Sequence, residues 1–401
     1  MESILVAGDA NRVVKGFQVS GIDAGIRAAF GKPSAPDLAL IAADGPCTAA
    51  GVFTTNLVKA APVILDEARL RANPNNVRAV LINTASANAC TGEIGLRNAE
   101  QSAAWTAEAL GCKPEQVLVM STGVIGVNLP MGQFQTGIPI AAAALQPDCW
   151  PEAARAIMTT DTKPKRVTMG GDYTLVGIAK GAGMIAPNMA TMLSVIATDA
   201  RIPAALLNQA LCEAVDQSFN RIVVDGDMST NDSLVILASG ASGLTIDGTR
   251  LADFTSKLTF VCHMLAQAIV RDGEGATKFI QLEITGARSV QEARQIGNAI
   301  ATSPLVKTAF YGGDANWGRI LAAAGRAGVL LDQSRLSLWF GDLQLVAGGV
   351  PLDYDDAQAN AITARPEVNV RLDLGLGDQQ AVIWTCDLSH EYVNINGHYR
   401  T

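Results

Sequence analysis

Short apolar runs bounded by turn residues recur along the 401-residue chain, and they constrain its fold more than any other feature. Each run is four to six residues long, which is the length of a strand and too short for a helix. The runs cover residues 38–42, 77–82, 117–120, 173–178 and 192–197. They carry almost no charge, so we predict that all five are buried strands.

Helical spacing appears between these runs. Apolar residues recur every three or four positions over residues 96–110, 207–214 and 254–269, and Pro203 suits the first turn of the second segment. Some predicted strands follow each other directly in the sequence, and the predicted helices occupy separate stretches of the chain. This order predicts an α+β fold of layered sheets covered by helices, rather than a strict alternation of strands and helices.

The last third of the chain shows a second set of elements. We predict a helix over residues 290–300, with Ser289 placed to cap it. Predicted strands follow at residues 337–340, 343–346, 368–374 and 380–384. We therefore expect two domains, a larger one over residues 1–280 and a smaller C-terminal α+β domain over residues 281–401.

Composition limits the function classes. The formal net charge is −8, which argues against binding to nucleic acid or to an anionic membrane. Hydrophobic residues make up 49% and charged residues 17%, so large buried cores are expected. The N-terminus carries Glu2 where a signal peptide needs basic residues, and no apolar segment reaches the roughly 20 residues of a membrane span. We predict a cytoplasmic protein, which suits seven cysteines without a C-x-x-C pair.

Several common site motifs are absent. The chain has no phosphate-binding G-x-x-x-x-G-K-[ST] loop and no G-x-G-x-x-G after a strand, and residues 240–243 miss the serine hydrolase elbow by one position. The three histidines are not spaced as metal ligands, so no metal is expected. The acidic residues Asp225, Asp227 and Asp232 lack calcium-loop spacing, which favours turn structure or support of an active site. We assign Asp314, Asn316 and Arg319 to a structural turn and an ion pair rather than to catalysis.

Residues 180–193 form a glycine-containing loop that leads into a predicted strand close to Thr191. A threonine at the start of a strand is ordinarily structural, because its β-branched side chain favours strands. From these residues alone, we therefore assign the loop no catalytic role.

Seven sequence blocks in this order resemble the glutamate N-acetyltransferase/ornithine acetyltransferase family of arginine biosynthesis. The blocks are residues 88–92, 121–126, 158–162, 180–193, 224–232, 271–278 and 314–319. The chain departs from the family at Ala315, where proline is usual, and the stretch between Thr162 and Lys180 is short. The resemblance covers the whole chain, and Ala315 lies away from the block that contains Thr191.

The resemblance implies a layered αββα-type sandwich with a smaller C-terminal domain. It also implies self-cleavage between Ala190 and Thr191, which produces an α chain of residues 1–190 and a β chain of residues 191–401. These chains assemble as an α₂β₂ tetramer. The implied reaction moves acetyl from N-acetylornithine to glutamate without a cofactor, and acetyl-CoA is a second acetyl donor in some relatives.

Cleavage has a physical reason. A threonine hydroxyl is a weak nucleophile, but a freed N-terminal threonine carries its own base, an α-amine with a pKa of about 7.7–8.0. The resemblance makes Thr191 this nucleophile, acetylated and deacetylated in a ping-pong scheme. It also implies that the Thr122 hydroxyl and the Gly123 backbone N–H form the oxyanion hole, although a Ser-Thr-Gly turn is usually structural.

The resemblance also implies a set of substrate-binding residues. They are Thr159, Lys180, Thr191, Glu274, Asn396 and Thr401. Lys180 and Glu274 lie among glycines, where the backbone can approach a ligand closely. Asn396 and Thr401 would otherwise form a frayed tail, so their role requires the C-terminus to fold back to the site.

Two alternatives remain open. An N-terminal-nucleophile aminopeptidase or amidase would share the self-cleavage but transfer the acyl group to water. A non-catalytic binding or scaffold protein would retain the fold and remain uncleaved.

Overall fold

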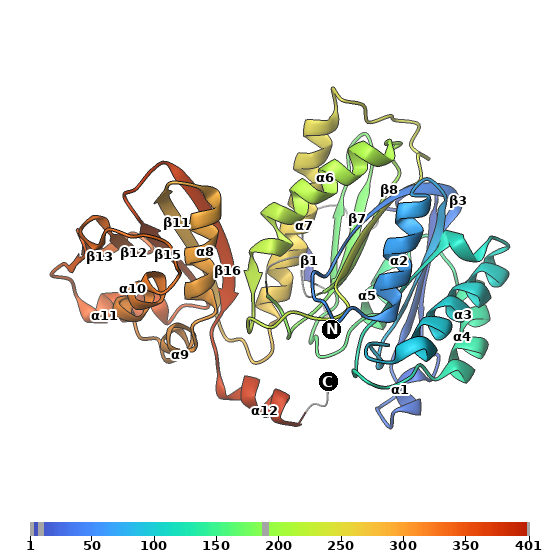
Figure 1. Cartoon of the computed structure of the whole chain (residues 1–401), viewed down its shortest axis with the longest axis horizontal. Helices are drawn as coiled ribbons and strands as arrows, with labels where there is room; N and C mark the ends of the chain where they lie inside the picture. The colour runs from blue at the N-terminus through green and yellow to red at the C-terminus, as the bar shows by residue number, and fades with distance from the viewer. Residues whose placement is uncertain (1–3, 7–11, 187–191, 399–401) are drawn as a thin grey trace.

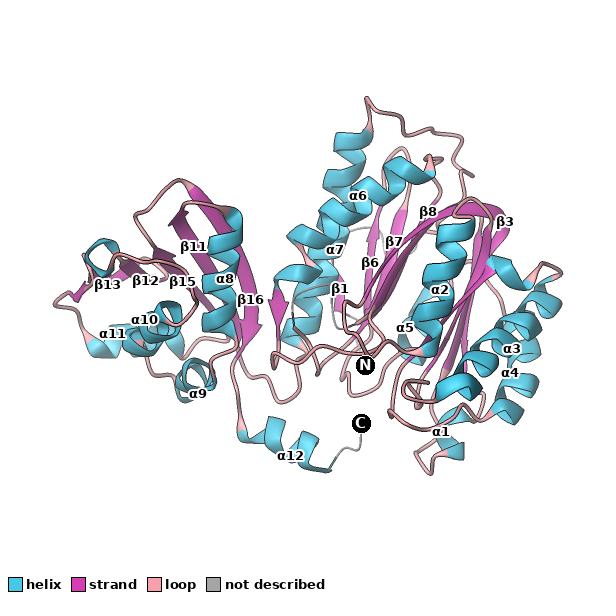
Figure 2. Cartoon of the chain, in the orientation of Figure 1, coloured by secondary structure: helices cyan, strands magenta, loops and turns pink. Residues whose placement is uncertain are grey.

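The computed structural model describes residues 4–6, 12–186 and 192–398. Within these ranges the chain forms two sheets, one of nine strands and one of seven (Figure 1). The larger sheet and its helices form the right part of the view in Figure 2, and the smaller sheet lies to the left. This arrangement confirms the predicted α+β class.

The larger sheet has the strand order β1-β6-β7-β8-β10-β3-β4-β5, and β2 pairs with β3. Its strands are β1 Ile4–Val6, β2 Phe17–Ile22, β3 Leu38–Phe53, β4 Val77–Asn83, β5 Val117–Ser121, β6 Lys165–Met169, β7 Leu175–Lys180, β8 Leu193–Thr198 and β10 Ser233–Ala238. The helices around it are α1 Ile26–Ala29, α2 Ala61–Ala72, α3 Gly92–Leu110, α4 Met131–Ala143, α5 Trp150–Ala156, α6 Ala204–Gln217 and α7 Leu251–Arg271.

Strand β3 joins two halves of this sheet. Its first part pairs with β2 and β4, and its second part, residues 48–53, pairs with β10. A register shift between Ala42 and Cys47 separates the two parts. The halves pack face to face, because one buried core contains Ile41 and Ile82 from one half with Val195 from the other.

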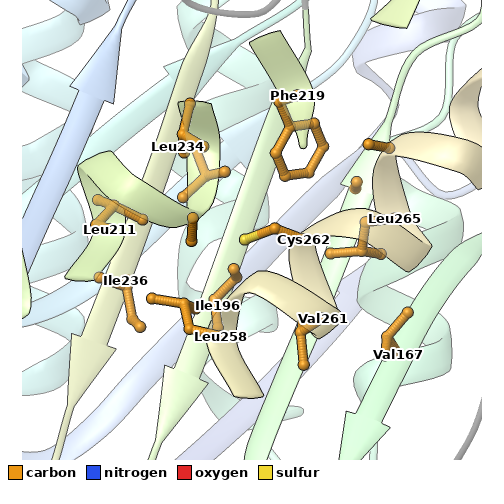
Figure 3. Packing of buried hydrophobic residues seen from close by; sticks show 14 of the residues in the cluster. Val167, Ile196, Leu211, Phe219, Leu234, Ile236, Leu258, Val261, Cys262 and Leu265 are labelled. Carbon is orange, nitrogen blue, oxygen red and sulfur yellow. The ribbon is translucent and has the colours of Figure 1, made fainter. Parts of the chain in front are cut away.

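Helices cover both outer faces of the paired halves. On one side α6 and α7 pack on β8 and β10, where Leu211 and Leu258 meet Ile196 and Ile236 (Figure 3). On the other side α3 and α4 pack on β3, β4 and β5. The layers therefore run helix, sheet, sheet, helix, which is the predicted αββα sandwich.

Each of the five predicted buried runs overlaps a strand of this sheet, although β7 and β8 start at Leu175 and Leu193, after the predicted starts at residues 173 and 192. Strand β3 is much longer than the predicted residues 38–42, because the polar and glycine-containing stretch after Ala43 continues to pair across the register shift. Strands β1, β2, β6 and β10 were not predicted. Strand β10 is an uncharged run, and its two paired neighbours, β3 and β8, become evident only in the sheet.

The smaller sheet has the order β14-β13-β12-β15-β11-β16-β9. Its strands are β9 Ile222–Val223, β11 Phe279–Ala287, β12 Ser337–Phe340, β13 Leu343–Ala347, β14 Val350–Pro351, β15 Glu367–Asp373 and β16 Gln379–Cys386. Its helices are α8 Val290–Ala301, α9 Pro304–Gly312, α10 Trp317–Gly325 and α11 Asp356–Thr363. Ser289 caps α8 as predicted, since its side chain accepts from the N–H of Glu292 at 3.2 Å.

Strand β9 comes from the middle of the chain but pairs with β16 at the edge of the smaller sheet. This short strand precedes the 224–232 block, so it ties that block to the C-terminal part. The division at residue 280 stays a prediction.

Asn316 caps α10 by accepting from the N–H of Arg319, which agrees with a structural role for this turn.

The last helix, α12 His390–His398, leaves the smaller sheet and runs back beneath the larger one (Figure 1). In the described part of the chain, no helix has both the length and the apolar character needed to cross a membrane.

Candidate active site

A cavity of about 270 Å³ opens where β5, β7, β8 and β10 meet the return of α12. Its lining residues come from five of the seven sequence blocks named above, namely 121–126, 158–162, 180–193, 224–232 and 271–278, and Ala87 precedes the 88–92 block. They include Thr122, Gly123, Thr159, Lys180, Met192, Asp225, Asn231, Asp232, Glu274, Tyr392 and Asn396. Residues from distant parts of the chain thus share one wall, which makes this cavity the candidate active site.

Nine residues were predicted for the site, and six of them are described. All six line the cavity, namely Thr122, Gly123, Thr159, Lys180, Glu274 and Asn396. Ala190, Thr191 and Thr401 lie outside the described residues. Met192, which follows Thr191 in the chain, also lines the cavity.

The turn after β5 holds Thr122 and Gly123 against the neighbouring loop. Thr122 donates its backbone N–H to the carbonyl oxygen of Asn83 at 3.0 Å, and Val124 donates to that of Ala85 at 3.1 Å. Between them Gly123 has a φ of 135°, a conformation that residues with a side chain rarely adopt. Among the described residues the Gly123 N–H has no acceptor. It is therefore a donor available to an oxygen in the cavity.

Lys180, the last residue of β7, contacts this turn directly. Its Nζ donates to Thr122 Oγ1 at 3.2 Å, so the threonine hydroxyl remains able to donate its own hydrogen. Burial lowers the pKa of Lys180, against the opposing effect of Asp161 and other carboxylates. A cation and a hydroxyl donor thus lie together at the wall where negative charge can be stabilised.

A buried triad supports this wall from behind. Lys165 Nζ lies 2.6 Å from Asp161 Oδ1 and 2.6 Å from Asp272 Oδ2. Asp161 accepts from the backbone N–H of Gly181 at 2.7 Å and from that of Thr159 at 3.0 Å. One carboxylate therefore fixes the backbone beside two predicted substrate residues, and sequence reasoning gave no role to Lys165.

Opposite charge controls the ionisation of the triad. Burial alone would raise the pKa of Asp161, but the cations of Lys165 and Lys180 and the Gly181 N–H lower it to about 2. Burial alone would lower the pKa of Lys165, yet the two carboxylates raise it. Asp161 and Lys165 are thus held in their charged forms.

Lys165→Met is expected to lower the melting temperature by on the order of 10 °C, because losing one partner of a buried ion pair costs about 3–5 kcal/mol. Calorimetry checks this, with Arg97→Met in the exposed Arg97–Glu93 pair as the control that stays near wild type. Because the pKa of Asp161 is lowered in the folded state, its contribution to stability is present above pH 4 and is lost as the pH falls toward 2. An equal melting temperature for Lys165→Met and wild type would contradict this role.

The glycine-rich block after Lys180 lets Glu274 approach the backbone. A Cβ on Gly183 would lie 2.6 Å from Glu274 Oε1, so any larger residue here would displace this carboxylate. Glu274 donates its backbone N–H to the carbonyl of Ala182 at 2.8 Å. Its Oε2 accepts from Asn396 Nδ2 at 2.7 Å, so α12 does return to the site.

Asp225 orders the other side of the block. Its carboxylate accepts from the backbone N–H groups of Met184 at 2.6 Å and Ile185 at 2.9 Å. The Tyr392 hydroxyl of α12 donates to the same carboxylate at 3.3 Å. Asp225 thus connects the segment that precedes residue 187 to the C-terminal helix.

Sequence reasoning missed Asn231. Its Nδ2 donates to the carbonyl oxygens of Ala87 at 2.6 Å and Ser121 at 2.8 Å, which ties the start of β10 to the end of β5. No residue pattern separates such an asparagine from an ordinary turn residue. Asp232, which the sequence left between turn structure and site support, is buried in the cavity wall.

Metal binding has no obvious site in the described ranges. There, no three His, Cys, Asp or Glu side chains gather as metal ligands. Asp225 and Asp232 both line the cavity, but Asp225 is occupied by backbone N–H groups and by Tyr392.

Comparisons with known proteins agree with the seven blocks. Residues 18–401 match the family model described as ArgJ family. The chain is 50% identical over 373 residues to the arginine biosynthesis bifunctional protein ArgJ of Symbiobacterium thermophilum, covering 91% of this chain and 92% of that protein. It is 47% identical to the protein of the same name from Chlorobaculum tepidum, with 98% of each chain covered.

A solved structure is also similar. The crystal structure of the arginine biosynthesis bifunctional protein argJ from Bacillus halodurans matches with 41% identity and a TM-score of 0.51. The match covers 100% of that crystallised chain and 52% of this one. With the family model and the relatives spanning nearly its full length, the chain belongs to the ArgJ family and is an acetyltransferase of arginine biosynthesis.

Proposed function

We propose that this protein cleaves itself between Ala190 and Thr191 and then moves acetyl from N-acetylornithine to glutamate. The observation that carries the proposal is the shared cavity. Thr122 and Gly123 present a hydroxyl and an N–H without an acceptor among the described residues to the same space that Met192 lines, and Met192 is bonded to Thr191 in the chain. A nucleophile at residue 191 would thus lie beside donors suited to an oxyanion.

Cleavage would begin with attack of the Thr191 Oγ on the carbonyl carbon of Ala190. The amide C–N bond breaks, the nitrogen takes up the proton, and an ester links the two residues. The α-amine of Thr191 is thereby freed, and water then hydrolyses the ester, which restores the Thr191 hydroxyl and separates the two chains. The crystallised relative supports two chains, because all of it matches about half of this chain, and residues 191–401 are 211 of 401 residues.

Acetyl transfer would use the same groups. The Thr191 Oγ attacks the acetyl carbonyl of N-acetylornithine, its proton passes to the α-amine, and ornithine leaves with that proton. Glutamate then attacks the acetyl-threonine through its own amine. The oxyanion of each step would accept from the Thr122 hydroxyl and the Gly123 N–H, with Lys180 Nζ next to them at 3.2 Å from Thr122.

The remaining charges suit amino-acid substrates. Lys180 would attract a substrate carboxylate, and the buried Glu274 would pair with the ornithine side-chain ammonium. Asn396 orients Glu274 in the structure, so α12 would contribute to specificity. Thr159 and Thr401 complete the proposed substrate set. No cofactor is needed, because the acyl group stays in a covalent ester between half-reactions.

The wider properties belong to the same proposal. The relatives are named bifunctional, which supports a second activity, and we propose acetyl-CoA as a second acetyl donor to glutamate. We further propose that the two chains assemble as α₂β₂ and that the protein acts in the cytoplasm. Neither nucleic acid nor a membrane is a proposed partner.

Two measurements on the wild-type protein test the proposal. Denaturing gel electrophoresis should show two bands of about half the 41.8 kDa chain rather than one. Incubation with N-acetylornithine and glutamate should give ornithine and N-acetylglutamate in equal amounts. Acetate in place of N-acetylglutamate would support an amidase instead, and a single persistent band without activity would support a non-catalytic relative. Replacing N-acetylornithine by acetyl-CoA tests the second donor.

A further inference from the structure

The side-chain amide of Asn231 lies buried where the two halves of the larger sheet meet at the cavity. Asn231 is 6% exposed and precedes β10 in one half, whereas β5 belongs to the other half. Its Nδ2 donates to the carbonyl oxygens of Ala87 at 2.6 Å and of Ser121 at 2.8 Å. Its Oδ1 accepts from the Thr230 hydroxyl at 2.6 Å, which fixes the direction of the amide. Both amide hydrogens therefore bind carbonyls of the opposite half.

The peptide that follows Ser121 is held at both of its polar atoms. Its carbonyl oxygen accepts from Asn231, and its N–H, that of Thr122, donates to the carbonyl of Asn83 at 3.0 Å. The next peptide carries the Gly123 N–H, which has no acceptor among the described residues. A peptide plane turns only as far as its neighbours allow, so the held peptide before it sets the direction of the Gly123 N–H.

The loop of residues 84–90 packs against the same turn after β5 and is strained. In the described ranges, three of the four non-glycine residues with a positive φ lie in this loop, namely Ala85, Asn88 and Cys90. Such conformations persist only where the surrounding structure holds them, and they cluster at functional sites. Asn231 supplies one of the holding contacts through the Ala87 carbonyl, and the Ala87 N–H donates to the carbonyl of Val124 in the turn at 3.0 Å. The loop and the turn thus form one unit, and Asn231 binds both parts.

We propose that Asn231 is a positioning residue, which holds the Thr122 hydroxyl and the Gly123 N–H in the direction where an oxyanion forms. The inference rests on the proposed function. Protein carbonyls already use both hydrogens of the Asn231 amide, so this amide acts on the oxyanion only through the turn. Donors fixed in advance stabilise developing charge without reorganising during the reaction, and a clamp between the two halves of the sheet keeps them fixed.

Asn231→Ala removes this clamp and leaves the donors themselves present. We expect kcat for acetyl transfer to fall about 10–100-fold, because a displacement of about 1 Å can cost about 10²-fold. The KM for N-acetylornithine should stay near its wild-type value, because Lys180 and Glu274 keep their contacts and both half-reactions use the same donors. Self-cleavage should slow too, so kcat is measured on protein that a denaturing gel shows to be fully cleaved. A raised KM with a wild-type kcat would overturn the inference.

A double-mutant cycle with Gly123→Ala shows whether Asn231 acts through the turn. If it does, the Gly123→Ala enzyme has already lost the placement that Asn231 maintains, so adding Asn231→Ala should lower kcat by less than about threefold further. Independent effects would multiply instead. A kcat loss equal to the product of the two single losses would indicate a structural role elsewhere in the fold and would overturn the inference.

Gln116→Ala is the matched control just before the start of β5, at the end of the strand away from the cavity. Gln116 is 8% exposed, its Nε2 donates to Asn76 Oδ1 at 2.8 Å, and its Oε1 accepts from the Lys113 N–H at 2.9 Å. Losing this buried amide should lower the melting temperature, as Asn231→Ala does, but leave kcat at its wild-type value. An equal loss of kcat in Gln116→Ala would show that Asn231→Ala reports destabilisation alone and would overturn the inference.

Thr230→Val is a milder second variant, which serves if Asn231→Ala does not fold. It keeps the amide but removes the hydroxyl that donates to Asn231 Oδ1, so kcat should fall about threefold or more. A wild-type kcat in folded Thr230→Val would then overturn the inference. A wild-type kcat for Gly123→Ala would overturn the proposed oxyanion hole and this inference together. A low kcat for Gly123→Ala with a wild-type kcat for Asn231→Ala would overturn the inference alone.

Discussion

Thr191→Ala is expected to leave one band near 41.8 kDa on a denaturing gel and to abolish acetyl transfer. The substitution removes the hydroxyl that attacks Ala190 and later carries the acetyl group, so neither the α-amine nor the acetyl ester can form. Gel electrophoresis of the purified variant over several days, together with the ornithine assay, measures both effects.

Two variants control this result. Thr191→Ser keeps a hydroxyl at the same position, so it should still be cleaved and active. Thr198→Ala removes a fully buried threonine at the far end of β8, outside the cavity lining, and should be cleaved like wild type. Cleavage of Thr191→Ala at the same peptide bond would refute the proposed nucleophile.

Gly123→Ala is expected to lower kcat by about 10²–10³, as loss of an oxyanion donor does in other enzymes. A Cβ on Gly123 would overlap the backbone carbonyl of Ala85 and lie 2.6 Å from the Ser86 nitrogen. These are backbone atoms that cannot turn aside, so the Gly123 N–H and the Thr122 hydroxyl must shift. Self-cleavage should slow as well, because the same donors serve its oxyanion.

Gly126→Ala is the matched control for backbone strain. Gly126 also has a positive φ, of 80°, but a Cβ there meets nothing within 4 Å. This variant should lose about 1–2 kcal/mol of stability and keep its kcat. Steady-state kinetics of both variants separates a displaced oxyanion hole from general strain, and a wild-type kcat for Gly123→Ala would contradict the assignment.

Local patterns predicted the elements that depend on neighbouring residues. The mainly apolar run at 77–82 became β4, the spacing over 254–269 became part of α7, and Ser289 became a helix cap. In each case the determining contacts lie within one strand or a few helical turns. The family resemblance likewise indicated which residues would share a site, and the six that are described do line one cavity.

Pairing between residues far apart in the chain determined the features that the sequence could not predict. The length of β3 depends on its changing partners from β4 to β10, and β9 has its partner β16 more than 150 residues away. Lys165 looks like any strand lysine until Asp161 and Asp272 lie on either side of it at 2.6 Å. A charge buried without such partners would be too costly, so its role follows from the tertiary fold.

By itself, the sequence determined the α+β class, the order of the main strands and helices, and through its seven blocks the family. Only the tertiary structure decided which groups face one another, such as Lys180 with Thr122 and Asn396 with Glu274. The reason is physical. Strand and helix preferences are local, whereas hydrogen bonding, burial and charge at a site depend on residues that only folding brings together.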